Sequence, residues 1–78
     1  MIRTEKIRGR MAELNIKVID LAEALGISRQ AMSDKLNGKT NITFSDANTI
    51  SRKLRLTKED RENIFFADLT SDNSQEAV

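Results

Sequence analysis

Apolar residues recur along the N-terminal part of the chain at helical spacing, with polar residues between them. The first apolar stripe is formed by Ile7, Met11 and Leu14. Because these residues are three to four positions apart, the pattern predicts an amphipathic helix over about 4–14, with Thr4 as its N-cap. Asn15 follows at a position where helices accept a left-handed residue, so the helix is expected to end there.

A second and a third helix are predicted on either side of a short turn. The second helix carries an apolar stripe that comprises Val18, Leu21, Ala22 and Leu25. Gly26 is expected to end this helix, because glycine readily adopts a left-handed conformation. Ser28 is the expected N-cap of the third helix, and Ile27 can pack against Met32 as a hydrophobic staple. The Asn-Gly dipeptide at 37–38 then predicts a turn.

Two capping motifs predict a fourth and a fifth helix. Thr43 with Asp46, and Thr57 with Asp60, have the spacing of a capping box. The fourth helix is expected to direct one apolar face inward, formed by Phe44, Ala47, Ile50 and Leu54. The fifth helix carries Ile64, Phe65 and Phe66. The sequence contains no alternation typical of strands, so the predicted fold class is all-α with five short helices.

The length of the chain, 78 residues, suits one domain. We expect residues 1–69 to form this domain, with no second domain after it. The net charge is only +1, from 13 Lys and Arg against 12 Asp and Glu, but it is unevenly distributed. All the cations precede residue 68 together with nine acids, a net charge of +4, and the remaining three acids follow. Residues 70–78 are therefore predicted to be a flexible acidic tail.

The composition excludes several classes of function. Histidine and cysteine are both absent, which excludes zinc fingers, imidazole bases and thiolate chemistry. The three glycines form no phosphate-binding loop, and so small a domain is expected to have little room for a pocket above about 300 Å³. We therefore expect no enzymatic activity, metal, cofactor or small-molecule ligand. The sequence contains neither a membrane-spanning run nor a signal peptide, so we expect a cytoplasmic protein without membrane contact.

The region around Gly26 has the spacing of a helix-turn-helix. Ala22 lies four residues before Gly26, where a small side chain lets two helices approach, and Met32 lies six residues after it, where an apolar side chain fixes the second helix. Together with Asn-Gly-Lys-Thr at 37–40, these residues resemble the helix-turn-helix of the phage Cro and repressor family over about 7–54. The resemblance implies a lambda-repressor-like fold and binding to a double-stranded DNA operator, as in a short single-domain phage regulator.

The resemblance also implies which side chains contact DNA, because the second helix of the motif enters the major groove with its N-terminal residues. The exposed positions expected to face base edges are Arg29, Gln30, Ser33 and Asp34. Arg29 can pair with guanine and Gln30 with adenine, while Asp34 accepts from cytosine, orients Arg29 or repels wrong sequences. Phosphate contacts are expected from Lys17, Ser28, Asn37, Lys39, Thr40 and Asn41. The alternative for each base position is an ordinary solvated helix face, and the alternative for Asn37 with Gly38 is a plain helix stop. Arg8 and Arg10 can also reach the phosphate backbone, but our interpretation of both is solvated charges.

The sequence departs from the family pattern where the second helix begins. Val18 and Ile19 stand where relatives commonly carry polar residues. We expect Ile19 to be exposed and to form, with Val18, a possible protein interface. Leu36 stands where many relatives carry a glutamate paired with an arginine, and Met11 is expected to face it as an apolar partner.

Near the end of the domain, Phe65 and Phe66 cannot both point straight inward. Either one is a core residue and the other flanks the core, or they form a subunit interface, which is the interpretation that we favour. Family analogy then implies a homodimer that contacts two half-sites about one helical turn apart. The first functional hypothesis is a Cro-like transcriptional regulator that acts in a genetic switch of a phage or mobile element. The alternative is a protein-binding module of the same fold, an antirepressor or co-repressor that binds a cognate phage repressor.

Overall fold

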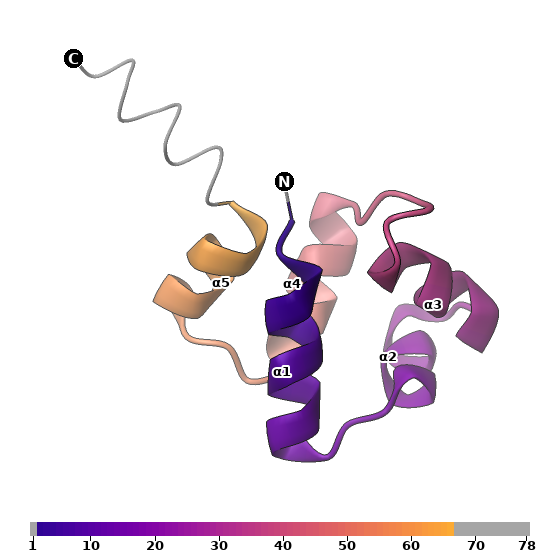
Figure 1. Cartoon of the computed structure of the whole chain (residues 1–78), viewed down its shortest axis with the longest axis horizontal. Coiled ribbons are helices and arrows are strands. Elements are labelled where there is room, and N and C mark those ends of the chain that lie inside the picture. Colours follow the sequence, from indigo (N-terminus) through magenta and orange to yellow (C-terminus); the bar gives the residue numbers. More distant parts are fainter. Residues whose placement is uncertain (1, 67–78) are drawn as a thin grey trace.

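The computed structural model describes residues 2–66, which fold into helices joined by short connections (Figure 1). The helices are α1 (Thr4–Leu14), α2 (Val18–Leu25), α3 (Arg29–Leu36), α4 (Phe44–Lys53) and α5 (Lys58–Phe65). No strand occurs among the described residues. The predicted all-α class with five helices is confirmed, whereas the predicted tail at 70–78 lies outside the described residues.

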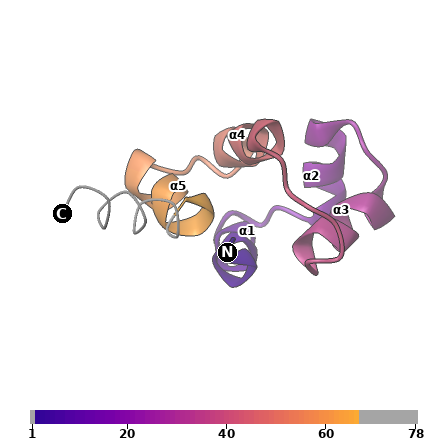
Figure 2. The ribbon, with the colours of Figure 1, turned by 90° about the horizontal axis from the view of Figure 1, so that it is seen from above.

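Helices α1 and α4 occupy the middle of the molecule, and the other helices form its two ends (Figure 2). Helix α2 packs against α3 and α4, while α5 packs against α1. As a result, α3 lies at one end of the domain and α5 at the other (Figure 1). Any surface built on α3 is therefore separate from any surface built on α5.

One apolar core holds these helices together. Every helix contributes to it, and its buried members are Ile7, Met11, Leu21, Ala22, Met32, Leu36, Ala47, Ile50, Leu54, Ile64 and Phe65. Each fully buried Leu, Ile or Met contributes about 1.5–3 kcal/mol. Met11 and Leu36 both belong to this cluster, in keeping with the expectation that Leu36 has an apolar environment instead of an ion pair.

Most of the predicted helix ends are confirmed. Asn15 and Gly26 both have the left-handed conformation, with φ of 56° and 72°. The Ser28 hydroxyl accepts a hydrogen bond from the Ala31 amide at 3.1 Å. Thr43 forms a complete capping box, because its hydroxyl accepts from the Asp46 amide and its own amide donates to the Asp46 carboxylate.

Two predicted caps are wrong in detail. Arg3 is the N-cap of α1, and Thr4 is already the first helical residue. The Arg3 amide donates to the Ile64 carbonyl at 2.9 Å, a contact with α5 that sets where α1 begins. The Thr57 hydroxyl accepts from the Asp60 amide as expected, but the reciprocal bond of a capping box is not formed at α5.

Phe44 does not point into the core as its spacing predicts. Its side chain is 65 % exposed, because it is the first residue of α4 and lies beyond the edge of the core. Its ring lies 5.7 Å, centroid to centroid, from that of Phe66 at the end of α5. The first residue of α4 therefore belongs to an aromatic surface patch with α5.

Candidate nucleic-acid interface

The turn between α2 and α3 is built as the sequence predicts. The Ile27 amide donates to the Ala22 carbonyl at 3.0 Å, and the left-handed Gly26 lets the chain reverse there. Ala22 and Met32 are both fully buried, so the small residue of α2 and the apolar residue of α3 meet the core as a helix-turn-helix requires. The N-terminus of α3 is held at the surface by this turn.

The first turn of α3 presents its polar side chains to solvent. Arg29 and Gln30 are exposed, whereas Ser33 and Asp34, which were also expected to be exposed, are half-buried. They lie one turn further along the helix, so the surrounding elements cover part of them. Arg29 and Gln30 are thus the side chains at this end of α3 that can reach furthest from the domain.

Asp34 holds the side chain of Gln30. The Gln30 Nε2 group donates to Asp34 Oδ1 at 3.0 Å. Among the alternatives expected for Asp34, an orienting role is supported, but its partner is Gln30 rather than Arg29. The second Nε2 hydrogen and the Oε1 atom of Gln30 are left available, and these are the donor and acceptor that pair with adenine.

The residues after α3 form a polar loop on the same side of the domain. The loop residues expected to contact phosphate are all exposed, namely Asn37, Lys39, Thr40 and Asn41. Gly38 has a left-handed φ of 80°, which only glycine adopts without strain. The loop therefore turns sharply and keeps its short donors at the surface.

Arg8 joins this loop from α1. Its Nη2 atom donates to Asn37 Oδ1 at 2.8 Å, so the expectation that Arg8 is simply solvated is wrong. The Asn37 amide group and the remaining guanidinium hydrogens stay free to donate to an anion. Sequence reasoning missed this pair because its members are 29 positions apart; the only local signal is that Arg8 lies beside the apolar stripe of α1.

Lys35 and Asp46 fix the loop at its other end. Lys35 Nζ lies 2.9 Å from Asp46 Oδ2 and donates to the Asn41 carbonyl at 2.8 Å. Burial raises the pKa of Asp46, but hydrogen bonds from Lys35 and Thr43, together with the charge of Lys35, outweigh this and lower the pKa below its ordinary value. The charge of Lys35 is therefore paired within the domain. Its hydrogen bond to the Asn41 carbonyl positions the loop.

Lys17 and Ser28 lie near the ends of the two motif helices. Lys17 is exposed, and its amide donates to the Asp20 carboxylate at 2.8 Å. Its ammonium group is therefore the part that remains for a phosphate. Ser28 is also exposed, and because its hydroxyl oxygen accepts from Ala31, the hydroxyl hydrogen is still available to a phosphate oxygen.

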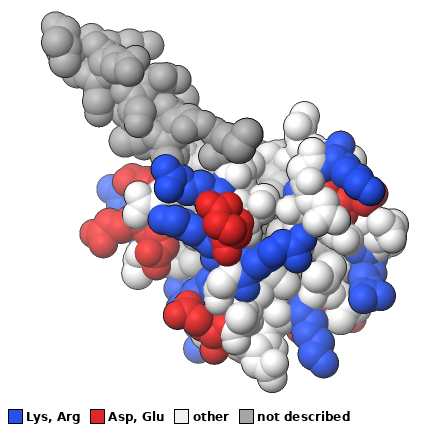
Figure 3. All heavy atoms as spheres, in the orientation of Figure 1, with Lys and Arg blue, Asp and Glu red and all other residues white. Residues whose placement is uncertain are grey.

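One face of the domain shows an uneven distribution of charged side chains. On the face shown in Figure 3, acidic side chains gather over α5 and along α1, while the end formed by α2 and α3 carries mainly Lys and Arg. The exposed acids of α5 are Glu59, Asp60 and Glu62. From residue 17 to residue 41, four Lys and Arg stand against three Asp and Glu, so attraction of a polyanion to this end depends on which cations are exposed and not on a large net charge.

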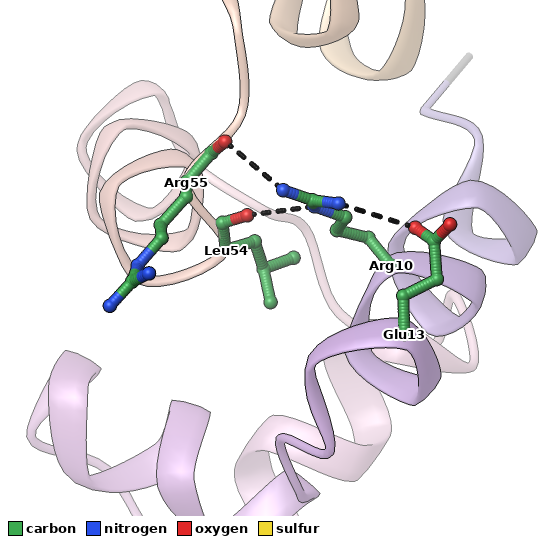
Figure 4. A network of polar contacts seen from close by, with 4 residues as sticks. All are labelled: Arg10, Glu13, Leu54 and Arg55. Atoms are coloured by element: carbon green, nitrogen blue, oxygen red, sulfur yellow. Dashed lines mark hydrogen bonds and ion pairs between the residues drawn. The ribbon is translucent and has the colours of Figure 1, made fainter.

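Arg10 acts inside the domain instead of at this surface. Its Nε atom donates to the Leu54 carbonyl at 3.0 Å, and its Nη2 atom lies 3.5 Å from the Arg55 carbonyl (Figure 4). Glu13 lies 3.4 Å from Nη1. Arg55 itself has a left-handed φ of 53°. Arg10 therefore caps the C-terminal end of α4, and the expectation that it is solvated is wrong.

The residues expected at protein interfaces fall into two separate places. Ile19, on α2, is 41 % exposed, and Val18 beside it is half-buried. Phe65 is buried in the core, whereas Phe66 is half-buried at the surface of α5. Arg61 lies with its guanidinium carbon 5.9 Å from the centroid of the Phe66 ring. One of the two phenylalanines is therefore a core residue and the other can contact a partner.

The domain has larger hollows than its size suggests. One open hollow between α1 and α2 has a volume of about 620 Å³, which corrects the expectation of little room above about 300 Å³. Within residues 2–66, no group of three or more acidic side chains is placed to hold a metal ion. None of the helices in that range is both long and apolar enough to cross a bilayer.

The buried turn, the exposed start of α3 and the polar loop after it define a helix-turn-helix DNA-binding domain. Residues 6–60 match the family model of the Cro/C1-type HTH DNA-binding domain, and the chain belongs to this family. This is a family of DNA-binding domains. Searches of curated proteins and of solved structures find no match.

Proposed function

We propose that this protein is a sequence-specific transcriptional regulator of the Cro/repressor type, which binds an operator in a genetic switch of a phage or mobile element. The observation that carries the proposal is the exposure of Arg29 and Gln30 on the capped first turn of α3. These are side chains that form paired hydrogen bonds with guanine and adenine in the major groove. Their position on the recognition helix of a DNA-binding family makes base readout their best-supported role.

In this proposal the domain is positioned by contacts on both sides of α3. Lys17 and Ser28 donate to the phosphates near the start of the helix, and the Arg8–Asn37 pair and Lys39 donate to those near its end. Such contacts fix the register of a protein on the duplex without reading its sequence. Because each phosphate contact displaces counterions from the DNA, we expect binding to weaken as the salt concentration rises, with a slope set by the number of these contacts.

A homodimer is part of the proposal. The patch formed by Phe44, Arg61 and Phe66 lies on α4 and α5, away from α3. A two-fold contact through this patch leaves both recognition helices free for two half-sites. The Phe44 ring is 65 % exposed and adjoins the Phe66 ring, so this surface offers more apolar area than Ile19 on α2, and this supports the choice of interface.

The experiment that tests this function is selection of bound duplexes from a random DNA pool, followed by salt titration of the selected site. Gln30→Ala is expected to lose about 1–3 kcal/mol of discrimination at one base pair. Lys39→Ala is expected to weaken all sequences alike and to reduce the salt slope by about 1. Lys58→Ala, at the α5 end, is the matched control and leaves both quantities unchanged. A pool that yields no preferred sequence contradicts the proposal.

The alternative function, binding of a cognate repressor, is favoured by one observation. Ile19 is exposed on α2 beside the proposed DNA interface, at the rim of an open hollow. An exposed aliphatic side chain contributes nothing to phosphate binding but is well suited to a protein partner. Ile19→Asp is expected to abolish such an association while leaving the helical content unchanged.

A further inference from the structure

The open hollow of about 620 Å³ is a groove between α1 and α2 that reaches the start of α3. Its apolar part is formed by Ile16, Val18 and Ile19, and cations from three elements border it, namely Arg8, Lys17 and Arg29. We call this surface the α1–α2 groove. No acidic side chain lines it among the described residues.

An apolar strip bordered by cations discriminates between partners. In the proposed DNA complex Arg8 and Lys17 meet phosphates and Arg29 meets a base edge, but phosphate oxygens gain nothing from the apolar surface of Ile19, which is 41 % exposed. A protein segment that carries a large apolar side chain flanked by carboxylates satisfies both, because it buries Ile19 and pairs with the cations. The chemistry of the groove therefore fits an acidic, amphipathic peptide better than it fits DNA alone.

We propose that the α1–α2 groove binds an acidic amphipathic segment of a partner protein and that this segment competes with DNA. The proposal rests on the proposed DNA-binding function and names the chemistry of a partner that regulates it. Lys17 and Arg29 border the groove and also belong to the proposed DNA interface. A segment that occupies the groove takes both cations from the DNA, because its carboxylates replace the phosphate that Lys17 meets and the base edge that Arg29 meets. Binding of the two ligands is therefore mutually exclusive.

The test uses a display library of short random peptides, selected on the full chain at low salt. Enriched peptides are expected to combine Asp or Glu with one or more large apolar residues. Their affinity, measured by fluorescence anisotropy, is expected to fall by more than about tenfold in Ile19→Asp, because the new carboxylate repels those of the peptide. Ala24→Asp places the same charge on an exposed position of α2 that does not line the groove, and it is expected to retain binding.

Competition with DNA separates this proposal from the proposed function. Unlabelled duplex from the DNA selection is expected to displace the peptide, and Ile19→Ser is expected to retain DNA binding while it loses peptide affinity. Gln30→Ala is expected to lose discrimination on DNA and to retain its affinity for the peptide. Three results overturn the proposal. The selected peptides show no enrichment of acidic and apolar residues, the Ile19→Asp variant binds the peptide as tightly as the wild type does, or the peptide and DNA bind at the same time. A chain that prefers no DNA sequence contradicts the proposed function, while peptide binding that depends on Ile19 still supports the groove.

Discussion

Gln30 and Asp34 form a hydrogen-bonded pair across one turn of α3, in which Gln30 Nε2 donates to Asp34 Oδ1 at 3.0 Å. A free glutamine side chain on a helix surface samples several rotamers, and fixing it costs entropy on binding. Here the cost is reduced before the domain meets DNA, because the carboxylate already holds the amide. The pair also sets the orientation of the amide, since its nitrogen must face Asp34 and its oxygen must face away.

The first prediction follows from this pair. Asp34→Ala is expected to reduce discrimination at the base pair read by Gln30 by about 1 kcal/mol, the usual net contribution of one hydrogen bond. Overall affinity for unrelated DNA is expected to rise, because a negative charge near the phosphates is lost. Competition titrations with the selected site and single-base variants of it measure both effects.

Asp34→Asn is the matched control, because it keeps an acceptor oxygen for Gln30 and removes only the charge. It is expected to restore the discrimination and to retain the higher affinity for unrelated DNA. If Asp34→Ala and Asp34→Asn discriminate equally well, Asp34 does not position Gln30.

The second prediction concerns the pair between α1 and the loop after α3. Arg8→Met keeps most of the aliphatic stem but removes the donor that meets Asn37 Oδ1 at 2.8 Å. The affinities for all DNA sequences are expected to fall by the same factor, and the slope of log affinity against log salt concentration is expected to decrease by about 1. Binding isotherms at several salt concentrations measure the slope, with Arg52→Met on the exposed surface of α4 as the control. A change in base preference would instead show that Arg8 acts through the recognition helix.

The third prediction concerns the pH dependence of stability at Asp46. Its pKa is lowered in the folded state, because hydrogen bonds and the charge of Lys35 outweigh the effect of burial. A carboxyl group with a lowered pKa stabilises the fold at pH values above its unfolded pKa, and this stabilisation is lost as the pH falls through the folded pKa. Asp46→Asn is therefore expected to unfold more easily at neutral pH, by about 1 kcal/mol.

Urea unfolding at pH 7 and near pH 3 tests this expectation. The difference in unfolding free energy between the wild type and Asp46→Asn is expected to narrow toward the acidic end. Lys35→Met removes the charge that pairs with Asp46. In this background, the difference in unfolding free energy between Asp46 and Asp46→Asn at pH 7 is expected to be smaller than in the wild-type background. A difference that is equal at both pH values would contradict an electrostatic role for the pair.

The fourth prediction concerns the cap of α4. Arg10 donates to the Leu54 carbonyl at 3.0 Å from a half-buried position, and Arg10→Met removes this bond while it keeps part of the stem. The free energy of unfolding is expected to fall by about 1.5–3 kcal/mol, the range for hydrogen bonds that involve a charged group. Denaturant unfolding measures it, and Arg52→Met again serves as the control. A loss no larger than that of the control would show that the cap contributes little.

The fifth prediction concerns the proposed dimer. Phe66→Ser removes a half-buried ring that lies 5.7 Å from that of the exposed Phe44, so it is expected to weaken self-association more than folding. Sedimentation at a series of protein concentrations is expected to show a dimer for the wild type and a monomer for the variant. Ile19→Ser, on the opposite end of the domain, is expected to remain dimeric. A wild type that is monomeric at all concentrations would exclude this interface.

Sequence reasoning succeeded where the physical cause lies within a few residues. The Ser28 cap, the Thr43 capping box and the left-handed Asn15 each join groups no more than about one helical turn apart. Gly26 and the spacing of Ala22 and Met32 were sufficient to predict the helix-turn-helix, because the turn itself depends on local steric conditions. The same reasoning placed Arg29 and Gln30 on the exposed start of the recognition helix.

Errors arose where a distant element intervenes. Thr4 was assigned as a cap because the contact of Arg3 with α5 has no local signature. Phe44 continues the apolar spacing of α4, but it extends past the edge of the core and meets Phe66 instead. Ser33 and Asp34 have the spacing of exposed residues, and neighbouring elements cover part of them.

The sequence by itself determined the five helices and the all-α class, while contact of Arg29 and Gln30 with base edges stays a prediction. The net charge of +1 gives little indication of a nucleic-acid partner. The sequence also shows that this charge is divided between a basic domain and acidic last residues. Only the tertiary structure decided which cations have partners within the domain. Arg10 caps α4 and Lys35 pairs with Asp46, while Arg8 joins Asn37. The reason is that charges separated by tens of residues find their partners through the packing of helices, which local sequence rules do not describe.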